Sequence, residues 1–190
     1  MKTALVSTPP CRRLVSISVC QLVVFEKAEK GSCMGDGPPL LMFFYGTLKR
    51  GGRNHGRYCG GALGVEEGAV RGDVYDLPFG YPALVVPEES IHAFGTGDFA
   101  RHAKEQRLGQ ESVASLEGPR VYGEIFAFDD PGSRLPTIDR LEGFDPADAS
   151  SHYRRVLLPV ERGDGSGLLA WAYVVAESSG IHLPGGRWPP

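Results

Sequence analysis

The chain has 190 residues, of which 42% are hydrophobic, and its formal net charge is −3. This length and apolar content predict one domain with a well-buried core rather than two full domains. No run of about 18 apolar residues occurs, which argues against a membrane-spanning helix. Residues 40–190 carry 15 lysines and arginines against 20 acidic residues, so nucleic acid is not expected as a partner.

The first 39 residues are predicted to be an N-terminal extension, either disordered or a non-native start upstream of Met34. Arg12 and Arg13 interrupt its apolar stretch and no clear cleavage site follows, which argues against a signal peptide. Residues 15–19 alternate as a strand does, so pairing with the body stays open.

The cysteines are concentrated in this extension, and only the last of them belongs to the body: Cys11, Cys20, Cys33 and Cys59. This distribution is typical of a reducing cytosol rather than of a secreted disulfide scaffold, so a cytoplasmic protein is expected. The histidines and cysteines show no spacing typical of a metal site, and none is predicted.

An apolar run that ends at a glycine opens the body of the chain. Residues 43–55 read FFYGTLKRGGRNH and predict a buried strand followed by a basic, glycine-rich loop. Gly46 adopts positive φ freely, so consecutive backbone N–H groups of such a loop can turn toward a small anion. An ordinary surface turn with a solvated basic tip is the alternative.

The next segments predict strands and then a long excursion. Residues 62–77 favour a strand bent at Gly68 or Gly72, and residues 81–86 favour a short strand. Pro82 places the latter at a sheet edge or at an early strand position. Residues 87–119 are predicted to be a long loop or insertion, with a helix over residues 98–108.

The second half predicts a strand over residues 121–129 and then a short helix, with Ser133 at its N-cap and Gly143 just past its end. Strands over residues 153–160 and 168–175 follow, before an irregular, Pro/Gly-rich tail over residues 177–190. Strand following strand predicts an α+β fold, in which residues 40–176 form a small mixed or antiparallel β-barrel with short helices at its side.

The short helix carries the clearest candidate for catalysis. Leu135, Ile138 and Glu142 are spaced i, i+3, i+7, so a carboxylate occupies a core-facing position. Burial and the negative end of the helix dipole both raise the pKa of such a glutamate toward the range useful to a general acid or base. A glutamate at a frayed helix end, bent out to water, is the alternative.

Other acidic residues are weaker candidates. Glu124 lies among aromatic residues on its predicted strand and is the second choice. Asp139 and Asp145 are predicted to be solvated surface groups.

Four motifs, in this order, resemble the γ-glutamylcyclotransferase-like superfamily, and the resemblance covers residues 41–175. The motifs are Tyr45-Gly46-Thr47-Leu48, Val121-Tyr122-Gly123-Glu124-Ile125-Phe126, Asp139-Arg140-Leu141-Glu142-Gly143-Phe144 and Tyr153-Arg154-Arg155-Val156. The loop at residues 45–55 is most similar to the γ-glutamylamine cyclotransferase branch.

The resemblance implies a small β-barrel enzyme without a cofactor, acting on a small-molecule γ-glutamyl substrate. Such enzymes release an amine from a γ-glutamyl amide and form 5-oxoproline. The matching positions imply that Glu142 is the catalytic glutamate and that Tyr153 lies near the pocket. The implied substrate-cradling loop is formed by Tyr45, Gly46, Thr47 and Leu48.

The chain departs from the family pattern in three places. Leu141 replaces a common aromatic residue, residues 87–119 are longer than the core needs and could cover the cavity, and the N-terminal extension has no counterpart. A non-catalytic barrel that binds a small anion or a peptide end, and another amide-cleaving activity on the same scaffold, remain the alternatives.

Overall fold

The computed structural model describes residues 38–109 and 117–189. The expectations for residues 1–37, including the alternating segment at residues 15–19, lie outside these ranges. Within the described ranges, no helix combines the length and the apolar character that crossing a membrane requires.

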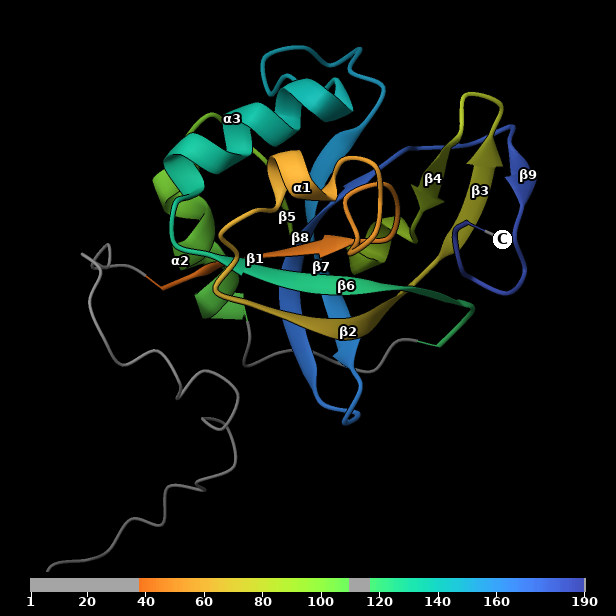
Figure 1. Ribbon diagram of the computed structural model, residues 1–190, viewed down its shortest axis with the longest axis horizontal. Helices are drawn as coiled ribbons and strands as arrows, with labels where there is room; N and C mark the ends of the chain where they lie inside the picture. Colours follow the sequence, from red (N-terminus) through yellow and green to blue (C-terminus); the bar gives the residue numbers. More distant parts are fainter. Residues whose placement is uncertain (1–37, 110–116, 190) are drawn as a thin grey trace, which may run out of the picture. The chain divides into compact units, whose positions relative to one another are not determined.

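Five strands close into a barrel in the order β2-β6-β1-β8-β7, and pairing of β7 with β2 completes it (Figure 1). The β1–β8 pair is parallel and the other pairs of the barrel are antiparallel. The predicted α+β fold with a mixed barrel is therefore confirmed. The strands are β1 (Leu40–Phe44), β2 (Gly64–Arg71), β6 (Arg120–Phe128), β7 (Arg154–Arg162) and β8 (Gly167–Val174).

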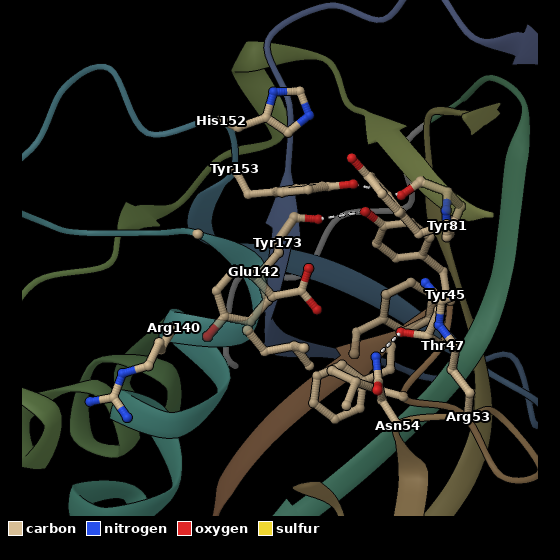
Figure 2. A pocket seen from close by; sticks show the side chains of 17 residues that line it. Tyr45, Thr47, Arg53, Asn54, Tyr81, Arg140, Glu142, His152, Tyr153 and Tyr173 are labelled. Atoms are coloured by element: carbon tan, nitrogen blue, oxygen red, sulfur yellow. Dashed lines mark hydrogen bonds between the residues drawn. The ribbon is translucent and has the colours of Figure 1, made fainter. Parts of the chain in front are cut away.

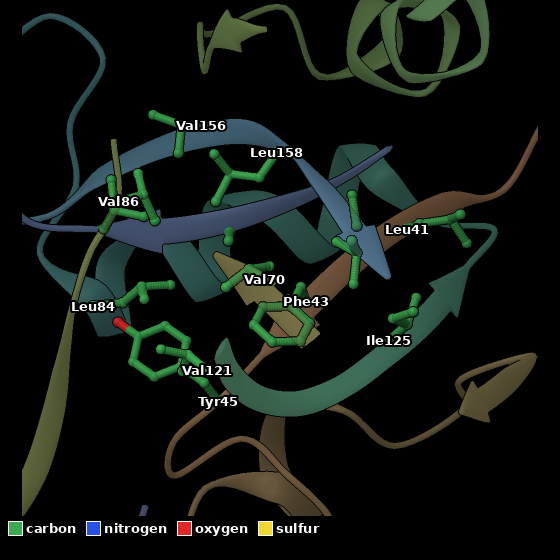
Figure 3. Packing of buried hydrophobic residues seen from close by; sticks show 14 of the residues in the cluster. Leu41, Phe43, Tyr45, Val70, Leu84, Val86, Val121, Ile125, Val156 and Leu158 are labelled. Carbon is green, nitrogen blue, oxygen red and sulfur yellow. The ribbon is translucent and has the colours of Figure 1, made fainter. Parts of the chain in front are cut away.

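The first strand is buried on both faces, which explains its unbroken apolar sequence. Leu41, Phe43 and Tyr45 pack in the barrel interior with side chains from the other strands (Figure 3). The alternate residues Met42 and Phe44 pack on the outside, in a second cluster that includes side chains of the helices. The strand thus runs through the middle of the hydrophobic core and fixes the position of the loop that follows it.

A small second sheet has the order β4-β3-β9 and consists of β3 (Asp73–Leu77), β4 (Tyr81–Val85) and β9 (Ile181–His182). The predicted strand at residues 62–77 is divided between the two sheets at Gly72, whose φ is +150°. A side chain at Gly72 would collide with the Val85 carbonyl, so glycine is needed at this crossing. Pro82 lies in an edge strand, as predicted, whereas the tail is not wholly irregular because it supplies β9.

The helices are α1 (His55–Tyr58), α2 (Phe99–Gly109) and α3 (Pro131–Glu142). The helix expected over residues 98–108 is confirmed as α2, and the same excursion adds a 3₁₀ turn (Glu88–Ser90) and β5 (Ala93–Phe94). The prediction of Ser133 as N-cap is wrong, because α3 begins at Pro131, whose fixed φ suits the first helical turn. Gly143 ends α3 with φ +66°, as predicted.

Candidate active site

A cavity of about 460 Å³ lies where β1 passes into its loop and where α3 ends. It is lined from five parts of the chain: the end of β1 with the loop that follows it, the start of β4, the end of α3, the residues that lead into β7, and Tyr173 of β8. All six residues predicted for the site are among those that line it: Tyr45, Gly46, Thr47, Leu48, Glu142 and Tyr153.

Glu142 is half-buried, and its carboxylate points into the cavity (Figure 2). Leu135 and Ile138 are fully buried two turns and one turn earlier on α3, which holds the helix against the barrel and turns Glu142 to the same side. Burial raises the pKa of Glu142 from 4.5 to about 7, and no partner among the described residues opposes this shift. The carboxyl group can therefore gain and lose a proton near neutral pH.

Internal hydrogen bonds hold the loop from Tyr45 to Leu48 in place. The Lys49 N–H donates to the Gly46 carbonyl (3.1 Å) and the Asn54 N–H donates to the Thr47 carbonyl (3.1 Å). Asn54 also donates from its side chain to the Thr47 hydroxyl (3.0 Å; Figure 2). In the part of the chain that the structure describes, no acceptor takes the N–H groups of residues 46–48. The loop thus offers donors to a ligand.

Gly46 packs closely against β4. A Cβ atom at this position would lie 2.7 Å from the Cγ atom of Pro82, whose ring cannot turn aside. The absence of a side chain at Gly46 therefore lets the loop approach the second sheet and narrows the cavity there.

Two tyrosines form buried walls of the cavity. The Tyr45 hydroxyl donates to the Tyr173 carbonyl (2.9 Å), and the Tyr153 hydroxyl donates to the Pro82 carbonyl (2.7 Å). Burial raises the pKa of both phenols above the ordinary value for tyrosine, so both stay protonated at neutral pH. The first hydrogen bond ties the residue after β1 to β8, and the second ties the residue before β7 to β4.

Sequence reasoning missed several lining residues, among them Asn54, Tyr81, His152 and Tyr173. Asn54 lies in the predicted loop and His152 directly precedes Tyr153, so for these two residues proximity to predicted site residues was an available signal. Tyr81 and Tyr173 come from distant segments, and only the folded barrel brings them to the site.

The basic residues that follow Leu48 have different environments. Arg53 lines the cavity, whereas the Lys49 ammonium donates to the Trp188 carbonyl (2.5 Å). Arg50 forms an ion pair with Glu124 (2.7 Å), and its N–H donates to the same carboxylate (2.7 Å). Glu124 does not line the cavity, so the second-choice acid anchors the loop instead.

The prediction that Asp139 is solvated is wrong. Its side chain is buried, pairs with the guanidinium of Arg155 and accepts a hydrogen bond from the Tyr173 hydroxyl (2.6 Å). Asp145 is exposed, as predicted.

The long excursion at residues 87–119 does not cover the cavity with any residue that the structure describes. Instead β5 pairs with β7, and α2 contacts α3, β1 and β8. Any effect of the described part of this segment on the site passes through the barrel and α3.

The family model described as "Gamma-glutamyl cyclotransferase, AIG2-like" matches residues 42–110 and 99–190. No curated protein sequence matches the chain.

Among solved structures, YkqA from Bacillus subtilis is 18% identical and superposes with a TM-score of 0.50. The match covers 79% of this chain and 39% of YkqA, so the chain spans about two-fifths of that protein. An AIG2-like protein from Mus musculus is 20% identical, with 75% of this chain and 81% of that chain covered and a TM-score of 0.47. At these identities the likeness concerns the fold alone.

Proposed function

Because the chain belongs to the gamma-glutamyl cyclotransferase, AIG2-like family, we propose that it releases an amine from a γ-glutamyl amide or peptide and forms 5-oxoproline. The glutamyl α-amine attacks the side-chain carbonyl carbon, a five-membered lactam closes, and the bond to the leaving amine breaks. One observation carries the proposal: the Glu142 carboxyl, with a pKa of about 7, faces a cavity lined by residues 46–48, whose N–H groups have no acceptor among the described residues.

Glu142 is proposed to move the proton in both halves of this reaction. The α-ammonium must lose a proton before its nitrogen can attack, and the leaving amine must gain one before it departs. A carboxyl group that titrates near neutral pH can accept the first proton and return it in the second step. The reaction consumes no water. Glu142 accepts one proton and returns it, so no second proton carrier is needed.

The loop from Tyr45 to Leu48 is proposed to hold the glutamyl group. Its N–H groups can bind the α-carboxylate or the oxyanion that develops on the attacked carbonyl. Because the nucleophile and the electrophile belong to one molecule, holding the chain folded supplies much of the acceleration through proximity. The walls formed by Tyr45 and Tyr153 confine the substrate on the same side as Glu142.

The proposed role of Glu142 predicts a dependence on pH. Only the ionised carboxylate can accept the proton, so kcat/KM is expected to fall about tenfold per pH unit below a pKa near 7 and to level off above it. A pH profile of 5-oxoproline release, recorded at substrate concentrations well below KM, measures this pKa. A profile that stays flat from pH 5 to pH 8 contradicts the role of Glu142 as the base.

The direct test is a panel of γ-glutamyl amines and γ-glutamyl dipeptides, analysed for 5-oxoproline and free amine in equal amounts. The γ-glutamyl amines are tested first, because we propose from the loop at residues 45–55 that the chain belongs to the amine-specific branch. Free glutamate in place of 5-oxoproline would indicate a hydrolytic activity on the same scaffold. Saturable binding without any product would indicate a binding barrel and refute the proposal.

A further inference from the structure

A fully buried arginine lies behind the cavity. Arg155 of β7 is 0% exposed, pairs with Asp139 and donates a hydrogen bond to the Thr96 carbonyl (2.8 Å). Its guanidinium also lies 5.2 Å from the ring centroid of Phe144, just beyond the end of α3. Well-packed apolar side chains stabilise a core as well as a buried ion pair does, so stability alone does not account for these residues.

Asp139 connects this arginine to the last turn of α3. Its carboxylate is held by Arg155 and by the Tyr173 hydroxyl (2.6 Å), so the helix is fastened to both β7 and β8. Its carbonyl oxygen accepts the N–H of Gly143 and the N–H of Phe144 (2.9 Å), which closes the helix end. Asp139 therefore holds this turn through its side chain and its main chain together.

Glu142 lies in the turn that is fastened in this way. It follows Asp139 by three residues, so the two side chains project from the same face of α3. Tyr173 and Tyr45 both line the cavity, and the Tyr45 hydroxyl donates to the Tyr173 carbonyl (2.9 Å; Figure 2). The buried contacts thus reach from Arg155 to both halves of the site, the helix end and the loop after β1.

We propose that Asp139 and Arg155 are positioning residues that act through Tyr173 and the last turn of α3 to aim the Glu142 carboxylate at the substrate. Both lie behind the cavity wall and neither lines the cavity. This positioning role rests on the proposed function, because it presupposes that Glu142 is the catalytic base. A shift of about 1 Å in a reacting group can cost about 100-fold in rate.

The test replaces Asp139 by asparagine in the full chain, which removes the charge and keeps the size. We expect kcat to fall about 10- to 100-fold. KM for the γ-glutamyl substrate should change less than about 3-fold, because the loop contact from Tyr45 is to the main-chain carbonyl of Tyr173, which Asp139→Asn leaves in place. The matched control is Glu66→Gln, which breaks the Arg162–Glu66 ion pair (2.8 Å) between β7 and β2, away from the cavity. We expect the control to keep both constants.

A second variant guards against a failure of Asp139→Asn to fold. Tyr173→Phe removes one hydroxyl and one hydrogen bond to Asp139 while the ring stays. A smaller loss in kcat, about 3- to 10-fold, is expected because Arg155 still holds the carboxylate.

A readout that does not depend on activity is the titration of Glu142, followed by NMR of the 13C-labelled carboxyl carbon. Release of the helix end would let water reach the carboxylate, so its pKa should move back toward the ordinary value in Asp139→Asn and also in Tyr173→Phe, which removes no charge. It should stay unchanged in Glu66→Gln. The charged and titratable side chains that share the cavity with Glu142 are Arg53, Arg140, His152, Tyr45, Tyr81, Tyr153 and Tyr173.

The two proposals can fail separately. A wild-type chain that forms no 5-oxoproline from any γ-glutamyl compound refutes the proposed function, and the NMR titration still decides whether Asp139 positions Glu142. A folded Asp139→Asn chain with the wild-type kcat and the wild-type titration of Glu142 overturns the positioning role.

Discussion

Replacement of Glu142 by glutamine is expected to lower kcat by about 10²- to 10⁴-fold, because the amide can neither accept the proton of the α-ammonium nor return it to the leaving amine. KM is expected to change little, since the side chain keeps its size and the loop from Tyr45 to Leu48 still holds the glutamyl group. The measurement is the rate of 5-oxoproline release at saturating substrate and pH 8, where most of the wild-type carboxyl is ionised.

The same variant is expected to be more stable than the wild type at high pH. The pKa of Glu142 rises from 4.5 to about 7 on folding. Between these pH values the unfolded chain ionises Glu142 while the folded chain keeps it protonated, so the wild type loses stability across this window and the loss stays constant above pH 7. At about 1.4 kcal/mol per unit, Glu142→Gln should gain about 3 kcal/mol at pH 8 and nothing below pH 4.5. Urea unfolding at these two pH values measures the difference.

The combination of a lower kcat and a higher stability at high pH distinguishes a catalytic role of Glu142 from a structural one. A glutamine variant that is inactive because it is misfolded would lose stability at every pH, whereas a variant that lacks only the proton carrier should gain stability at high pH. Glu66→Gln is the matched glutamate control and should keep full activity, since Glu66 pairs with Arg162 away from the cavity. Turnover by Glu142→Gln within about tenfold of wild type would refute the assignment.

The sequence predicts well where the loop after β1, the Glu142 carboxylate and the end of α3 lie, because local patterns determine these positions. The apolar run of β1 and the glycine that follows it locate the loop. The spacing of Leu135, Ile138 and Glu142 locates the carboxylate on the core-facing side of α3. Gly143 marks the end of that helix through its positive φ. Each of these signals depends on neighbours within one or two turns of the chain.

The buried pair behind the site, Asp139 and Arg155, could not be predicted in this way, because it forms between distant segments of the chain. Asp139 is spaced four residues after Leu135 and three before Glu142, so the helical period could have placed it on the buried face. Its polar side chain favoured a solvated position because no partner is nearby in the sequence. The partner is Arg155, and only the register of β7 in the barrel brings it to α3.

The buried ion pair gives the largest expected effect on stability. Arg155→Met should lower the free energy of unfolding by about 3–5 kcal/mol, because it leaves the Asp139 carboxylate buried without its countercharge. The double variant Arg155→Met with Asp139→Leu should recover most of this loss, since both charges of the pair are then removed. Urea unfolding at pH 7 compares the two variants with wild type.

Arg162→Met on the same strand is the control, because its pair with Glu66 is partly exposed and should cost only about 1 kcal/mol or less. If the double variant regains stability and still turns over substrate much more slowly than wild type, the pair serves the geometry of Glu142 rather than the fold. Full recovery of both stability and kcat would instead mean that any well-packed contact at this position suffices to hold the last turn of α3.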